Sequence, residues 1–125
     1  MSPLEIFIAI CIVESGLNPN VKPGDNGRSI GIAQIQSSVI VDINERFNLN
    51  MRHEDALDPA SAFKIFYYYT KRYNAQTPES MARLWNGGPR KRGTDNYWNR
   101  VKETLNDRKG MADGRKRYFD IVNKR

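Results

Sequence analysis

Cysteine, histidine and long apolar runs are scarce in this chain of 125 residues. Cys11 is the only cysteine, so the fold cannot rest on an internal disulfide. Its place within an apolar run predicts a buried small side chain rather than a nucleophile. His53 is the only histidine and stands in a charged stretch, with no second histidine or cysteine to complete a zinc set. We therefore interpret His53 as a surface residue and expect no metal ion and no cofactor.

The longest apolar run covers residues 6–13, far short of the roughly 20 residues that a membrane-spanning helix needs. We therefore expect no membrane span. A secretory signal peptide is not expected either, because the N-terminus lacks basic residues, Glu5 interrupts the region that should be apolar, and no small-residue cleavage site follows. These features predict a protein made in the cytoplasm, which something else must carry to any site of action outside it.

The length and the charge distribution limit the possible functions. A chain of this length forms one domain with a single core, which we place at residues 1–125. The net charge of +6 is uneven, since residues 1–89 carry eight Lys/Arg against nine Asp/Glu, while residues 90–125 carry twelve against five. Such asymmetry favours an acidic partner, which is a nucleic acid, an anionic membrane or a bacterial cell wall. The segment 106–125 is the basic C-terminal end.

Helix signals outnumber strand signals, so the sequence predicts a mainly α fold. Three pairs, Ser2–Pro3, Asp58–Pro59 and Thr77–Pro78, each place an N-cap side chain before a proline at the first helical position. The spacing of apolar residues predicts helices over 3–14, 37–47, 59–73, 78–85 and 94–106, with a last short helix over 118–122. In the third of these helices, the residues predicted to face the core are Ala62, Phe63, Phe66, Tyr67, Thr70 and Tyr73.

Two carboxylates differ in their sequence surroundings. Glu14 ends the apolar run, where burial and the C-terminal end of a helix both disfavour its charged form and predict a raised pKa. Asp25 lies between Gly24 and Asn26, where exposure and hydrogen bonding are expected to keep it ionised. One protonated and one ionised carboxylate is the arrangement that glycosidases use. The alternatives are a surface glutamate at a helix end and an aspartate that only forms a turn.

Four motifs follow one another along the chain: Glu-Ser-Gly at 14–16, Asp-Asn-Gly-Arg-Ser-Ile-Gly-Ile-Ala-Gln-Ile at 25–35, Ala-Arg-Leu-Trp-Asn-Gly-Gly-Pro at 82–89, and Tyr-Trp-Asn-Arg-Val at 97–101. In this order they resemble the lysozyme superfamily, most closely the invertebrate-type (destabilase-like) lysozymes. The Glu-Ser and Gly-x-x-Gln parts are also similar to goose-type lysozymes and soluble lytic transglycosylases. The resemblance covers residues 5–105 and implies a lysozyme-like domain with a buried central helix and a substrate cleft.

The resemblance implies cleavage of the β-1,4 bond between N-acetylmuramic acid and N-acetylglucosamine in peptidoglycan. Glu14 matches the general acid of the superfamily, and Asp25 matches the second carboxylate of a muramidase. A lytic transglycosylase instead uses one glutamate as acid and then as base, and releases 1,6-anhydro products. Trp85 either stacks on a sugar or packs in the core. The residues expected to bind substrate are Ser15, Ser29, Gln34, Trp85, Asn86, Gly87 and Tyr97.

Two departures qualify the resemblance. Invertebrate-type lysozymes are rich in disulfides, which this chain cannot form, and Gln36 stands where the goose-type pattern has an acidic residue. We expect a monomer that acts on peptidoglycan or chitooligosaccharides at the bacterial cell wall. It is a phage product released with a holin or carried in a virion, or else a bacterial wall-remodelling enzyme, and the absence of a signal peptide favours the phage product. A basic nucleic-acid-binding protein is the alternative of another class, but aromatic residues are not interleaved with the basic ones. An inactive glycan-binding relative is a further alternative.

Overall fold

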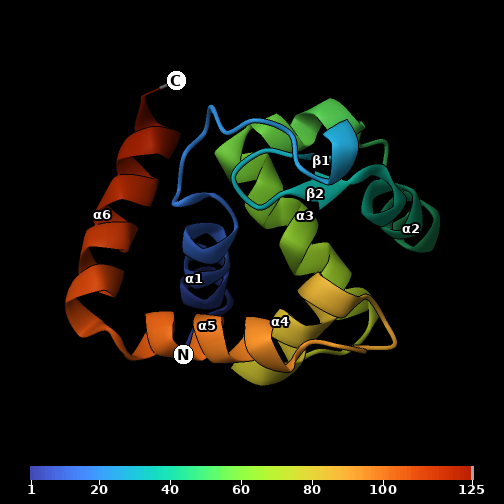
Figure 1. Cartoon of the computed structure of the whole chain (residues 1–125). Helices are drawn as coiled ribbons and strands as arrows, with labels where there is room; N and C mark the ends of the chain where they lie inside the picture. Colours follow the sequence, from blue (N-terminus) through green and yellow to red (C-terminus); the bar gives the residue numbers. More distant parts are fainter. Residues whose placement is uncertain (125) are drawn as a thin grey trace.

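The computed structural model describes residues 1–124 and is mainly helical, as predicted (Figure 1). A small antiparallel hairpin and two 3-10 turns interrupt the helices. No helix in residues 1–124 is long and apolar enough to span a membrane. The elements are α1 (Pro3–Ser15), η1 (Asp25–Gly27), β1 (Ser29–Ile30), β2 (Ile35–Gln36), α2 (Ser37–Phe47), η2 (His53–Leu57), α3 (Pro59–Arg72), α4 (Pro78–Gly87), α5 (Asp95–Asn106) and α6 (Arg108–Asn123).

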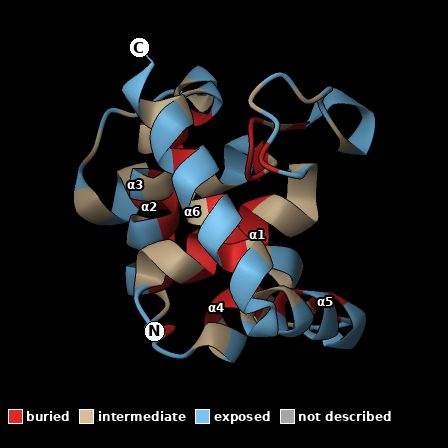
Figure 2. Ribbon diagram, turned by 90° about the vertical axis from the view of Figure 1, so that its left-hand side faces the viewer, coloured by how far each residue is buried: buried red, intermediate tan, exposed pale blue. Residues whose placement is uncertain are grey.

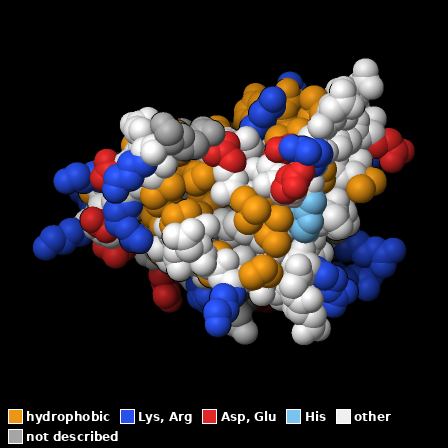
Figure 3. Space-filling model, turned by 90° about the horizontal axis from the view of Figure 1, so that it is seen from above, with side chains coloured by type: hydrophobic (Ala, Val, Ile, Leu, Met, Phe, Trp, Pro, Cys, Tyr) orange, Lys and Arg blue, Asp and Glu red, His pale blue; other side chains and the backbone are white. Residues whose placement is uncertain are grey.

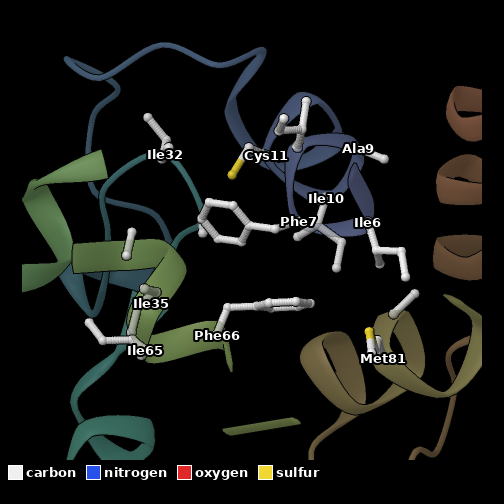
Figure 4. Packing of buried hydrophobic residues seen from close by; sticks show 14 of the residues in the cluster. Ile6, Phe7, Ala9, Ile10, Cys11, Ile32, Ile35, Ile65, Phe66 and Met81 are labelled. Atoms are coloured by element: carbon white, nitrogen blue, oxygen red, sulfur yellow. The ribbon is translucent and has the colours of Figure 1, made fainter. Parts of the chain in front are cut away.

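Helix α1 is the central helix that the sequence predicts. Residues 6–11 are all buried, Cys11 among them, because α3, α4, α5 and α6 pack around α1 (Figure 1). In Figure 2, α6 lies in front with its exposed face toward the viewer and the buried residues of α1 lie behind it. The ring of Phe7 packs on that of Phe66 with a centroid separation of 5.3 Å (Figure 4). Helix α1 is therefore surrounded by protein on nearly every side up to its C-terminal turn.

The predicted helix starts are confirmed, and each N-cap side chain accepts a hydrogen bond from a backbone N–H. Ser2 caps α1 through the N–H of Glu5 at 3.2 Å. Asp58 caps α3 in the same way at 3.1 Å, and Thr77 caps α4 at 3.0 Å. Helix α4 continues to Gly87, two residues beyond the predicted end, since the left-handed backbone (φ +71°) comes only at Gly88.

The predicted core face of α3 is partly wrong. Tyr67 is 45 % exposed, whereas Ile65 and Tyr69 are buried. With 3.6 residues per turn, Tyr67 lies about 100° around the helix from Phe66, on the side away from Tyr69. The buried face of α3 is therefore centred closer to Tyr69 than the sequence pattern suggests.

The prediction of a short last helix over 118–122 is also wrong, because α6 runs from Arg108 to Asn123. Asp107 caps it by accepting a hydrogen bond from the N–H of Gly110 at 3.0 Å. Gly114 lies on the buried face, and a Cβ there would approach the Cδ1 atom of Ile12 to 2.9 Å. The absence of a side chain at Gly114 thus allows α6 to lie close against α1.

The hairpin rests on η2 through backbone contacts. Strands β1 and β2 pair antiparallel, with Ser29 opposite Gln36. Gly31 in the connecting turn has φ +79°, and a Cβ there would lie only 2.1 Å from the carbonyl oxygen of Ala56 in η2. His53 is half-buried, and its Nε2 lies 2.7 Å from the carbonyl oxygen of Ile35. The prediction of a surface histidine is confirmed in part, because the imidazole is visible at the surface (Figure 3) but also joins η2 to the hairpin.

Candidate active site

A cleft of about 580 Å³ lies between the hairpin with the start of α2 on one side and the end of α4 on the other. Seven of the residues that the sequence singles out line it. Ser15 and Tyr97 are not among the lining residues. Those that line it are Glu14, Gly24, Asp25, Ser29, Gln34, Ile35, Gln36, Ser38, Val39, Tyr69, Trp85, Asn86, Gly87, Gly88 and Pro89.

Glu14 enters the cleft from the last turn of α1. Burial disfavours its charged form and raises its pKa to about 6. The hydroxyl of Tyr97 donates to the Oε2 atom of Glu14 at 2.9 Å. This bond and the positive charge of Arg100 both lower the pKa of Glu14. Desolvation outweighs both, and the negative charge of Asp25 adds to the rise. A carboxyl with this pKa holds a proton in mildly acidic solution, as a general acid must.

Asp25 approaches the same cleft from the exposed turn η1, with its backbone in the left-handed region at φ +50°. Its Oδ2 atom accepts hydrogen bonds from the Ser29 hydroxyl at 2.6 Å and from the Gln36 amide at 3.2 Å. Both bonds favour the ionised form, so they lower the pKa of Asp25. The structure thus brings together one carboxyl with a raised pKa and one with a lowered pKa.

Two of the predicted substrate residues shape the loop that carries Asp25. The Gln34 side chain accepts from the N–H of Gly24 and donates to the carbonyl of Gly31, both at 3.0 Å. The Ser15 hydroxyl donates to the carbonyl of Ile32 at 2.7 Å. These bonds fasten the hairpin to itself and to the end of α1. Gln34 also lines the cleft, whereas Ser15 is not among its lining residues.

The opposite wall consists of the end of α4 and the glycine turn that follows. The indole N–H of Trp85 donates to the carbonyl of Ala33 at 3.0 Å, and its ring meets Phe66 and Tyr69 edge-on. Trp85 therefore packs against the core and also lines the cleft. At Gly88 the backbone is left-handed and a Cβ would find open space, so this part of the wall has no side chain to keep a glycan away.

Tyr69 lines the cleft, as do Gln36, Ser38 and Val39, although none of the four was among the predicted site residues. The ring of Tyr69 lies between those of Tyr73 and Trp85, which it meets edge-on with centroid separations of 5.3 and 5.9 Å. Burial is the main cause that raises the pKa of its hydroxyl to about 12, so the group stays a hydrogen-bond donor. Nothing distinguishes it in the sequence from its two tyrosine neighbours in the run 67–69. Within residues 1–124, no three His, Cys, Asp or Glu side chains are grouped to hold a metal ion.

Comparison with protein families supports the assignment suggested by the motifs. The model of the transglycosylase SLT domain matches residues 1–108, which include every residue of the cleft. No significant match was found among curated proteins or among solved structures. The matched family is one of the groups that the sequence motifs resemble, so the predicted membership of the lysozyme superfamily is confirmed. The chain therefore belongs to the transglycosylase SLT domain family, whose members are glycosidase-like enzymes that act on peptidoglycan.

Proposed function

We propose that this protein cleaves the β-1,4 bond after N-acetylmuramic acid in peptidoglycan as a lytic transglycosylase, with Glu14 as the single acid and base. The observation that carries the proposal is the environment of Glu14, whose pKa is raised to about 6 within a cleft. The match to the transglycosylase SLT domain supports the choice of transglycosylation over hydrolysis.

The proposed reaction uses the Glu14 carboxyl twice, first as an acid and then as a base. Neutral Glu14 protonates the glycosidic oxygen, the bond from this oxygen to the muramoyl C1 breaks, and positive charge develops at C1. The Glu14 carboxylate then takes the proton of the muramoyl 6-hydroxyl while that oxygen bonds to C1. The products are a new non-reducing end and a 1,6-anhydro end, no water is consumed, and Glu14 is again protonated.

Asp25 has a supporting role in this reaction. Its lowered pKa keeps it ionised, so a negative charge faces the cleft while positive charge develops on the sugar. The same observation favours a second candidate function, in which Asp25 stabilises or captures the glycosyl group and water completes hydrolysis as in a muramidase. The two candidates differ in their products.

Product analysis in H₂¹⁸O separates the two candidates. We expect purified peptidoglycan to yield muropeptides with 1,6-anhydro ends and no ¹⁸O, detected by mass spectrometry. Reducing ends labelled with ¹⁸O would instead establish the muramidase reaction. The variant E14Q serves as the inactive reference, and E45Q, which changes an exposed glutamate on α2, is the matched control that retains activity. If the wild-type protein releases neither product from peptidoglycan, the proposed function is wrong.

We also propose that the basic C-terminal end draws the protein to an anionic cell wall. Helix α6 carries exposed Arg108, Lys109, Lys116 and Arg117. Lys and Arg side chains gather at the left of the face in Figure 3, the side on which α6 lies in Figure 1. Attraction between exposed charges weakens as salt screens it, so binding to isolated walls is expected to decrease with ionic strength.

A further inference from the structure

A second pocket, of about 400 Å³, opens beside the catalytic cleft. We call it the side pocket. Gln36 and Ser38 line both cavities, so the side pocket adjoins the cleft at the side of Asp25. It is formed by the turn η1, the start of α2 and the first residue of η2. Its lining residues are Gly27, Arg28, Gln36, Ser37, Ser38 and His53.

The side pocket carries a positive charge and no acidic side chain among its lining residues. The Arg28 Nε atom donates to the backbone carbonyl of Asp25 at 3.1 Å, which fixes the direction of the guanidinium. Its terminal nitrogens make no hydrogen bond or ion pair within residues 1–124. The positive charge also interacts with the Asp25 carboxylate and lowers its pKa, while the terminal nitrogens can still donate hydrogen bonds to a ligand. A guanidinium held in this way suits a planar anion, because two parallel N–H groups match the two oxygens of a carboxylate.

The other side chains of the side pocket add further hydrogen-bonding groups. The imidazole of His53 is visible at the surface in Figure 3 as the pale blue side chain. A carbonyl only accepts, so the contact with Ile35 requires a proton on Nε2 and leaves Nδ1 for a ligand. Ser37 and Ser38 contribute exposed hydroxyls. The pocket thus combines one cation with several polar groups that a peptide can use.

We propose that the side pocket binds a carboxylate of the peptide stem that branches from the glycan strand. The inference rests on the proposed function, because a peptide branch exists only on peptidoglycan. In the proposed reaction the muramoyl residue lies in the cleft near Glu14, and its peptide branches from it beside the side pocket, which adjoins the cleft. The side pocket opens next to that position and offers Arg28 to the anionic groups of the branch.

The test compares glycan strands that carry peptides with strands from which an amidase has removed them. For R28Q, we expect the preference for peptide-bearing strands, measured as the ratio of the two kcat/KM values, to fall about tenfold, as loss of one partly exposed charge-assisted hydrogen bond implies. R28K keeps the positive charge but lacks the two parallel N–H donors of a guanidinium, so it is expected to retain part of the preference. R46Q removes an exposed arginine of α2 outside the side pocket and is the matched control.

An equal effect of R28Q on both substrates would overturn the proposal and show that Arg28 acts only through the turn that holds Asp25. No effect on either would also overturn it. Binding to the E14Q protein, measured by calorimetry, provides a readout that does not depend on cleavage. Peptide-bearing fragments are expected to bind more tightly than stripped fragments and than fragments with amidated stem carboxylates. If wild-type protein cleaves neither substrate, the proposed function fails, whereas the binding comparison still decides on the side pocket.

Discussion

Glu14 ends a helix that is buried along most of its length, whereas Asp25 lies in an exposed turn between glycines. Desolvation by the packed helices raises the pKa of Glu14, and two hydrogen bonds from Ser29 and Gln36 lower that of Asp25. Packing between distant segments therefore controls the pKa of Glu14, whereas local hydrogen bonds control that of Asp25. Variants at these residues and at their neighbours test this difference.

The largest difference is expected between E14Q and D25N. E14Q removes the proton donor, so the rate of glycan cleavage should fall at least about 10³-fold, within the range that general acid–base catalysis contributes. D25N keeps the shape of the turn and removes only a supporting charge, so we expect a loss below about tenfold. Rates of release of soluble muropeptides measure both. The exposed-site changes E45Q and D120N are the controls, and equal losses for E14Q and D25N would favour the two-carboxylate muramidase mechanism.

The next largest effect is expected on stability, from alanine substitutions at Gly31 in the hairpin and at Gly16 after α1. G31A places a Cβ 2.1 Å from a backbone oxygen in η2 and at φ +79°, so the free energy of unfolding should decrease by about 3 kcal/mol. G16A at the end of α1 has a similar φ of +65° but open space, and should cost about 1 kcal/mol. Urea unfolding monitored by circular dichroism measures both. Similar losses would show that strain in φ, not the contact of the hairpin with η2, dominates at Gly31.

The pH dependence of stability follows from the raised pKa of Glu14. The folded state holds this proton more tightly than the unfolded state, so its contribution is present below the unfolded pKa and is lost as pH rises through about 6. The rise from 4.5 to about 6 corresponds to about 2 kcal/mol. E14Q should remove this dependence when urea midpoints are compared between pH 4 and pH 8. The contribution of Asp25 to stability depends on pH in the opposite sense. Because its pKa is lowered in the folded state, this contribution is lost as the pH falls.

The smallest effect is expected for Y97F, which removes the hydrogen bond to Glu14 while leaving the ring in place. The bond favours the charged carboxylate, so its loss should raise the pKa of Glu14 further and shift the alkaline limb of the pH–activity profile to higher pH. We expect kcat to change by about tenfold or less. Y68F, on a tyrosine outside the cleft, should leave the profile in place, and an unchanged profile in Y97F would show that this bond does not tune Glu14.

Much of the helical framework follows from local sequence signals. The capped starts at Pro3, Pro59 and Pro78 lie where predicted, since an N-cap side chain and a proline act within one turn of chain. The burial of α1 follows from an apolar run with no polar side. Glu14 is identifiable for the same reason, because a carboxyl directly after such a run has little access to water.

Contacts between distant segments could not be read in this way. Gly114 of α6 lies against Ile12 of α1, and the imidazole of His53 meets the carbonyl of Ile35. Tyr69 lines the cleft with its ring against Trp85. None of these partners is near in sequence, so the role of each residue is not apparent from its local sequence.

Most of the helices and the buried centre follow from the sequence alone, because they depend on local backbone preferences and on the transfer of apolar side chains from water, and the same pattern predicts Glu14 as the acid. What surrounds Glu14 depends on the tertiary structure. Folding brings Tyr97 to Glu14 across 83 positions of chain and places Asp25 at the mouth of the same cleft. The side pocket beside it exists because η1, α2 and η2 meet there, and electrostatic interactions depend on such distances in space rather than on separation along the chain.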